Sequence, residues 1–504
     1  MWETVHTITA VSRQRVGLTR GRKAYLAFAW LALLWSVGNC LYVYVIRAGG
    51  FMFRLESAVY ILAGVLLPLL FWRRSQAAPA ETLGPLECRG LMLAASVLWL
   101  ITIAPLIQFP FLSDDYVFLT SYAHWSDVFR FAQFFRPLFG GTFHLLSRLG
   151  QGSVVPFHLA AFVIHAVSAA MVFVLARRFF RRDDAAALSF AMFLLNPLQL
   201  EAVLWTSGLQ ELLWTAFLLS GLIVYTGRQV LTPARIAAAT SLLACGLLAK
   251  ESAIAWVLLA PAADWVGYRM KRGGLLAAAY GSFAVTGLAY LIVRAQVTSI
   301  DPGFFATPGT YFVKQLVGAP YRFFVQPWNS LAAPLSPYLL CAVSAVAIVL
   351  LFRAVLRGAG PTILAGPTVI LFTTLPVYSY FYVAPDLRGA RYLYFAAAGW
   401  ALLTGHVLGS SFTRRQTIGV AFVAVVVLSF ASLRLNLRPW RTAAEIVTSV
   451  QASVREGRPA DALEWQRRYG PGLEMKGDVP YVYEGVYLFV NGYPELQQML
   501  AATK

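Results

Sequence analysis

The sequence contains little charge: 13% of its 504 residues are Asp, Glu, Lys or Arg, whereas 59% are hydrophobic. A soluble protein of this length carries roughly 25% charged residues, about twice that fraction. Apolar runs long enough for membrane-spanning helices recur from one end of the chain to the other. Because lipid offers backbone groups no partner outside their own helix, this composition excludes a soluble fold and predicts an all-α polytopic membrane protein.

Cysteine is also scarce, and its spacing matches neither a disulfide framework nor a zinc site. The four cysteines are scattered along the chain: Cys40, Cys88, Cys245 and Cys341. Three of them lie inside apolar runs, so we interpret them as small buried residues. His158 and His165 lie seven residues apart on one predicted helix face without a third ligand nearby, which favours packed histidines over a metal site. The sequence predicts no metal site and no certain cofactor, although a divalent cation stays open.

The apolar runs predict thirteen spans. They are Ala24–Ile46, Phe51–Trp72, Gly90–Ile107, Val154–Ala176, Ala185–Leu195, Ser207–Thr226, Ala234–Leu248, Ser252–Trp265, Gly274–Val293, Leu335–Leu351, Pro361–Pro376, Leu393–Leu408 and Ile418–Leu433. Several are shorter than a full crossing needs, so we expect about 11–13 transmembrane helices. The basic N-terminus lacks a small-residue cleavage site after its first apolar run, which indicates a retained helix rather than a signal peptide.

The net charge of +18 is distributed as in a membrane protein. The N-terminal tail and the loops on its side of the membrane hold 21 of the 41 Lys and Arg residues, against 11 in the opposite loops. Because short cytoplasmic loops carry excess positive charge, the N-terminus is expected inside. The sequence thus predicts a cytoplasmic basic tail (1–23), a membrane domain (24–433) and a small extracytoplasmic C-terminal segment (434–504).

Two of the outer loops are long, residues 108–153 and 294–334, and long loops in compact proteins are usually functional. The first contains "HWSDVFRFAQFFRPLFGGTFHLLSRLG", in which aromatic and leucine residues recur at helical spacing among arginines. This pattern predicts one or two amphipathic helices lying at the membrane surface. For the helix alone, the pattern favours a surface helix without a catalytic role.

The stretch "FPFLSDDYVFL" opens that loop with two adjacent carboxylates, Asp114 and Asp115. A helix start capped by Ser113 explains one aspartate well and the second less well. Neighbouring carboxylates in a partly dry site repel, which leaves one of them more basic. Such a pair can divide the work, one taking a proton while the other holds a hydroxyl or a cation.

Further charged residues stand in apolar surroundings on the same predicted side. They are Arg136 in "FFRPLFGG", Glu201 and Glu211 in "LEAVLWTSGLQELLW", Lys250 and Glu251 in "LLAKESAIAW", and Arg388 and Arg391 in "YVAPDLRGARYLYF". Ionisable groups at membrane depth are candidates for function. The structural alternatives are nonspecific lipid contacts for Arg136, a mutual ion pair for Lys250 and Glu251, and an interfacial aromatic belt around Arg391. Carboxylates together with several cations are what a transferase needs to act on a phosphate-bearing lipid.

In chain order, "DDYVFL", "FFRPL", "NPLQLEAVLWTSG", "LLAKES" and "RYLYF" resemble the GT-C membrane glycosyltransferases. The similarity is to the protein O-mannosyltransferase-like branch with tetratricopeptide tails and its bacterial relatives, and it covers residues 100–440. The tetratricopeptide repeats are missing here. Ala161 and Ala390 replace residues typical of the family, so the resemblance does not identify the sugar or the acceptor.

The resemblance implies a GT-C fold and a polyprenyl-phosphate-linked monosaccharide as donor. It also implies a lipid, glycan or protein acceptor, and a multi-pass protein of the inner (plasma) membrane whose active site faces outward. It assigns Asp114 as the general base and Asp115 as its helper. The implied ligands of the donor phosphate are Arg136, Lys250, Arg388 and Arg391; those of the sugar or acceptor are Glu201, Glu251, His158 and Tyr392.

Two other functions remain open on the sequence. An envelope oligosaccharide polymerase or ligase also uses outer-loop arginines, but would typically lack a paired aspartate at the start of the first large outer loop. A lipid or glycan flippase would place charged residues at mid-membrane in both halves of a symmetric chain. Neither charged mid-membrane residues in both halves nor internal symmetry of the chain is evident in the sequence.

Overall fold

The computed structural model describes residues 81–112, 114–129, 134–227, 231–266, 275–298, 361–378, 389–412 and 414–456, with the single residues 350, 354, 458 and 464. The longer helices are α3 (Pro85–Ile103), α4 (Asp114–Ser121), α5 (Pro137–Gly150), α6 (Val155–Phe180), α7 (Asp183–Leu194), α8 (Gln199–Leu204), α9 (Leu209–Tyr225), α10 (Pro233–Ala249), α11 (Trp256–Val266), α12 (Leu275–Val297), α16 (Ala365–Tyr378), α17 (Tyr394–Ser411) and α18 (Arg415–Arg455). Short 3-10 turns connect them: η3 (Ala104–Leu106), η4 (Trp125–Phe129), η5 (Thr206–Gly208), η6 (Glu251–Ala255), η8 (Pro361–Leu364) and η9 (Ala390–Leu393). Within these ranges the chain is helical and contains no strand.

Among the described residues, five helical segments are long and apolar enough to cross a membrane, which supports the predicted membrane character. They are Pro85–Leu106, Val155–Phe180, Thr206–Tyr225, Leu275–Val297 and Arg415–Ser453. Ten predicted spans coincide with helices, some of them short: α7 and α11 have 12 and 11 residues. The predicted spans Ala24–Ile46 and Phe51–Trp72, most of Leu335–Leu351 and nearly all of the loop 294–334 lie outside the described residues.

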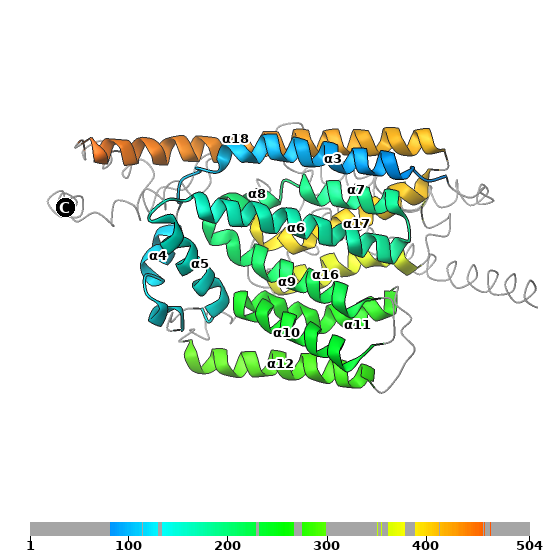
Figure 1. Ribbon diagram of the computed structural model, residues 1–504, viewed down its shortest axis with the longest axis horizontal. Helices are drawn as coiled ribbons and strands as arrows, with labels where there is room; N and C mark the ends of the chain where they lie inside the picture. The colour runs from blue at the N-terminus through cyan, green and yellow to red at the C-terminus, as the bar shows by residue number, and fades with distance from the viewer. Residues whose placement is uncertain are drawn as a thin grey trace, which may run out of the picture.

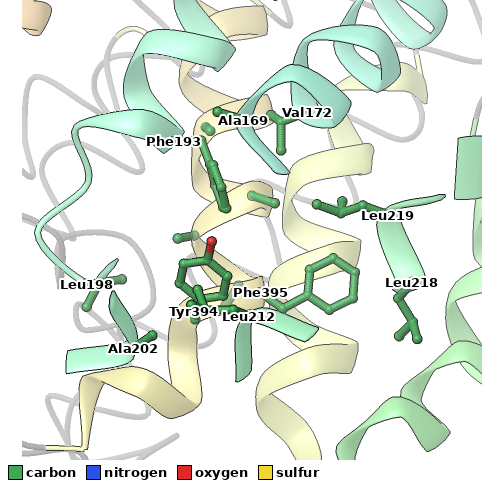
Figure 2. Packing of buried hydrophobic residues seen from close by; sticks show 14 of the residues in the cluster. Ala169, Val172, Phe193, Leu198, Ala202, Leu212, Leu218, Leu219, Tyr394 and Phe395 are labelled. Atoms are coloured by element: carbon green, nitrogen blue, oxygen red, sulfur yellow. The ribbon is translucent and has the colours of Figure 1, made fainter. Parts of the chain in front are cut away.

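The core lies where α6, α7, α9 and α17 pack together, and Figure 2 shows its side chains. Helix α7 is buried from Asp184 to Leu194, as expected for a helix surrounded by other helices. Tyr394 at the start of α17 donates its hydroxyl to His165 Nδ1 over 2.7 Å, and His165 Nε2 contacts the Leu194 carbonyl at 3.2 Å. The interpretation of this histidine as a packed residue is confirmed.

The two ends of the bundle differ in character (Figure 1). At one end, the basic residues of the predicted inner loops form ion pairs: Arg415 with Glu87, Arg182 with Asp184, and Arg177 with Asp183. At the other end, α4 and α5 lie across the direction of the long helices. Helix α5 buries Phe139 and Phe143 while Leu145 and Leu149 are exposed, as predicted for an amphipathic surface helix.

Helix α18 has 41 residues and continues without interruption past the predicted domain boundary after Leu433. At 1.5 Å per residue it is about 60 Å long, roughly twice the thickness of a hydrocarbon core. Its second half reaches α4, because Trp440 packs against Phe109 at 6.2 Å between ring centroids and Gln451 Nε2 donates to the Tyr116 hydroxyl over 3.1 Å. The start of the C-terminal segment is thus an extension of a bundle helix.

Candidate functional site

The segment that leads into the paired aspartates is fixed through its backbone. His158 Nε2 on α6 donates to the Phe109 carbonyl over 2.8 Å, and Trp205 Nε1 donates to the Leu112 carbonyl over 3.0 Å. The Leu112 N–H donates to Asp115 Oδ2 over 2.9 Å. Three separate elements therefore hold this short connection in place before α4 begins.

The two aspartates at the start of α4 have different surroundings. Asp115 is fully buried, and its Oδ1 accepts hydrogen bonds from both the backbone N–H and the hydroxyl of Ser207. Burial raises the pKa of Asp115 to about 6, although hydrogen bonds from Leu112 and Ser207 favour its ionised form. Asp114 is half-buried at the first position of the same helix. Of the two aspartates, Asp114 is therefore the less buried residue.

Arg391 on η9 forms a buried ion pair with Glu201 on α8. The Arg391 backbone N–H also donates to Glu201 Oε2 over 3.3 Å, so the carboxylate contacts this residue twice. The guanidinium carbon lies 4.2 Å from the ring centroid of Trp205 and 4.4 Å from that of Tyr392. Stacking on aromatic rings at these distances fixes the position and orientation of the Arg391 guanidinium.

Lys250, directly after α10, forms an ion pair with Glu211 on α9, and both side chains are at most 4% exposed. Glu211 Oε2 also accepts from Trp214 Nε1 over 2.6 Å. The Lys250 ammonium lies 4.7 Å from the ring centroid of Tyr392, the ring that also contacts Arg391. Tyr392 therefore lies between the Arg391–Glu201 pair and the Lys250–Glu211 pair.

Arg136, which precedes α5, forms the third ion pair, with Glu251 on η6. Its Nε donates to Glu251 Oε2 over 2.8 Å, Nη2 donates to Oε1, and Nη1 donates to Gln210 Oε1 on α9. Burial opposes ionisation of Glu251, yet the charge and hydrogen bonds of Arg136 and the charge of Lys250 lower its pKa to about 2. Glu251 is thus a carboxylate at neutral pH.

These contacts bring residues from distant parts of the chain to the end of the bundle where α4 and α5 lie. Among the described residues the site contains three cations, Arg136, Lys250 and Arg391, each paired with a glutamate. It joins the aspartates through the α8–α9 connection, because Trp205 contacts Arg391 and Ser207 contacts Asp115. Separate sequence stretches therefore form one charged site.

The structure differs from one sequence interpretation. Lys250 and Glu251, adjacent in the chain, do not form a mutual ion pair, because each pairs with a residue on another helix. The backbone turns between α10 and η6 at Lys250, which directs the two neighbouring side chains to different partners. The sequence neighbours thereby link α9 to the start of α5.

The remaining predicted residues lie as follows. His158 is fully buried and its contact is with the Phe109 backbone, so it positions the segment before the aspartates. Tyr392 is within the site, where Arg391 Nη2 donates to its hydroxyl over 2.8 Å. Arg388 lies outside the described residues.

Three site residues were not singled out from the sequence: Trp205, Ser207 and Gln210. Trp205 and Ser207 are 2% and 1% exposed, and Gln210 is 7% exposed, although the last two are polar. The sequence feature that could have identified them is their place in "WTSGLQELL", where polar residues interrupt two apolar runs. Buried polar groups need partners, so such an interruption predicts specific contacts.

Among the described residues, no group of three or more His, Cys, Asp or Glu side chains is placed to hold a metal ion. His158 and His165 both use a ring nitrogen on a backbone carbonyl. The charges of the site are instead those of Arg, Lys and carboxylate side chains.

Comparison of the chain with protein-family models, with curated proteins and with solved structures finds no match. The resemblance to the GT-C glycosyltransferases therefore rests on the ordered motifs alone. Function has to be argued from the geometry of the site.

Proposed function

We propose that this protein is an inverting glycosyltransferase of the GT-C type. It moves a monosaccharide from a polyprenyl-phosphate donor to a hydroxyl acceptor on the extracytoplasmic side of the membrane. The observation that carries the proposal is the convergence of three cations on the same end of the bundle as Asp114. An apolar bundle gives a lipid-linked donor access to such a site, and the cations match its phosphate.

Asp114 is the general base of the proposed reaction. It removes the proton of the acceptor hydroxyl as the oxygen attacks the anomeric carbon from the face opposite the phosphate. The bond between the anomeric carbon and the phosphate oxygen breaks, and its electron pair leaves with polyprenyl phosphate, so the anomeric configuration inverts. Asp115 is unsuited to this step because it is fully buried and both its oxygens accept hydrogen bonds from the protein.

The cations stabilise the leaving group. Negative charge grows on the phosphate as the glycosidic bond breaks, and fixed cations in a dry site stabilise such charge more than water does. Arg391 is held by Glu201 and two aromatic rings, so its position is set before the donor arrives. The same preorganisation applies to Lys250, fixed by Glu211.

The proposed orientation rests on charge. Arg177 of α6, Arg182 before α7 and Arg415 at the start of α18 lie at the end opposite the site, and an excess of positive charge in short loops is typical of the cytoplasmic side. The site then faces away from the cytoplasm, where a polyprenyl-phosphate sugar in the outer leaflet and an envelope acceptor can both reach it.

The test uses the purified full-length protein with a panel of polyprenyl-phosphate sugars. We expect the wild type to consume one donor and release polyprenyl phosphate. Asp114→Asn should not consume that donor. Glu87→Gln, which alters an exposed ion pair at the other end of the bundle, is the matched control and should keep full activity. If no lipid-phosphate donor is consumed, the proposal is wrong.

A further inference from the structure

The three ion pairs of the site differ in how exposed the side chain of the acidic partner is. The side chains of Glu211 and Glu201 are 1% and 2% exposed, whereas that of Glu251 is 27% exposed. Displacing a buried carboxylate from its cation leaves an unpaired charge in a dry site, which is strongly unfavourable. A carboxylate with access to water regains hydration when it leaves. Glu251 is therefore the acidic partner that can move at the lowest cost.

The contacts of Arg136 show what Glu251 occupies. The carboxylate takes the edge of the guanidinium formed by Nε and Nη2, while Nη1 donates to Gln210. Two parallel N–H donors on one edge are the geometry that binds a phosphate through two of its oxygens. Glu251 thus stands where a phosphate would bind on that edge, and the two anions exclude each other.

Charge balance leads to the same conclusion. Arg136, Lys250 and Arg391 are matched by Glu251, Glu211 and Glu201, so the three pairs are neutral together. A sugar phosphodiester brings one more negative charge into this set. Movement of one carboxylate into water restores the balance, and its low pKa keeps Glu251 charged throughout the neutral range.

We propose that Glu251 is an exchangeable counterion of Arg136, which it holds in the empty site and releases to the donor phosphate. This inference rests on the proposed function, because it assumes that a lipid phosphate binds at these cations. Glu251 then lowers donor affinity and neutralises Arg136 while the site is empty. Glu201 and Glu211 stay paired, so Arg391 and Lys250 keep their positions during the exchange.

The experiment measures binding of undecaprenyl phosphate to the full-length protein in phosphatidylcholine nanodiscs, with undecaprenol as the phosphate-free probe. In Glu251→Gln the competing charge is gone, and we expect affinity for undecaprenyl phosphate to rise about tenfold, the change that about 1.4 kcal/mol produces. Undecaprenol binding should not change. Glu87→Gln, at the other end of the bundle, should bind both probes like the wild type.

A second variant guards against misfolding, since Glu251→Gln leaves Arg136 without an anionic partner. Glu251→Asp keeps the charge but is shorter by one methylene, so it cannot hold both N–H groups of the Arg136 edge. We expect it also to bind undecaprenyl phosphate more tightly than the wild type, and the probe to raise the melting temperature of either variant more than that of the wild type.

The outcomes separate the two proposals. If the wild type binds undecaprenyl phosphate no better than undecaprenol, the phosphate site itself is wrong, and the exchange falls with it. If the wild type prefers the phosphate but neither Glu251 variant gains affinity, the exchange is wrong while the proposed function stands. A gain in both variants without a gain in Glu87→Gln supports the exchange.

Discussion

Ser207 donates both its backbone N–H and its hydroxyl to one oxygen of Asp115, and the aspartate is fully buried. This contact joins the start of α4 to the connection between α8 and α9. The two adjacent carboxylates therefore differ in their surroundings: Asp115 is held at the start of α4 by Ser207, whereas Asp114 at the preceding position is half-buried and is the base of the proposed reaction. The predictions below follow from this division and from the ion pairs beside it.

Asp115→Ala should destabilise the protein and reduce activity together. The change leaves the N–H groups of Leu112 and Ser207 and the Ser207 hydroxyl without their acceptor, and buried unsatisfied donors cost about 1–3 kcal/mol each. We expect a lower midpoint of thermal unfolding and a lower kcat, since Asp114 shifts with the helix. Ser207→Ala removes one hydrogen bond and should show a smaller effect on both. Normal stability in Asp115→Ala would disprove the positioning role.

Stability should depend on pH through Asp115. Its pKa is raised from 3.8 to about 6 in the folded protein, so the folded state binds a proton that the unfolded state has released. The stabilisation is complete below about pH 4 and is lost as the pH rises through 6, a difference of about 3 kcal/mol. Thermal unfolding of wild type and Asp115→Asn between pH 4 and 8 measures it, and the variant should lack this contribution. Parallel curves would contradict it.

Replacing only one partner of the ion pair between Lys250 and Glu211 should strongly destabilise the fold. Both side chains are buried, and removing one partner leaves an uncompensated charge, at a cost of about 3–5 kcal/mol. Glu211→Gln should therefore lower the unfolding midpoint strongly. The double change Glu211→Gln with Lys250→Met removes both charges and should recover much of the stability. Donor consumption should stay low in the double variant, because a cation of the proposed phosphate site is gone.

Trp440 should connect the long helix α18 to the aspartate segment. Its ring packs against Phe109 and it is 7% exposed, so truncation to alanine removes a large buried contact, worth about 3–5 kcal/mol in protein cores. We expect Trp440→Ala to lower stability and kcat. Gln451→Ala loses only the hydrogen bond to Tyr116 and should lower kcat with little change in stability. Unchanged kcat in both variants would show that α18 does not position α4.

Hydropathy and periodicity predicted the helices well, because membrane helices must satisfy their own backbone groups. Ala234–Leu248, for example, was predicted as a span and is helix α10, Pro233–Ala249. The predicted span Ile418–Leu433 ends with the apolar run, whereas helix α18 continues to Arg455 and its buried face includes Trp440 and Val447. Composition marks lipid contact, whereas packing against other helices sets where this helix stops.

The charged residues of the site could be found from sequence because ionisable groups are rare in apolar surroundings. Their partners could not. Nothing local pairs Arg136 with Glu251 or Arg391 with Glu201, since each contact joins segments more than a hundred residues apart. The division of roles between Asp114 and Asp115 likewise depends on Ser207, which folding brings from another element.

The most direct test of the account is transfer from a polyprenyl-phosphate sugar by wild type and by Asp114→Asn, both checked for equal thermal stability. The account predicts that the wild type consumes one donor of the panel and releases polyprenyl phosphate, while Asp114→Asn stays folded and loses at least about 100-fold in rate, the contribution of a general base. Equal rates in the two proteins would contradict it.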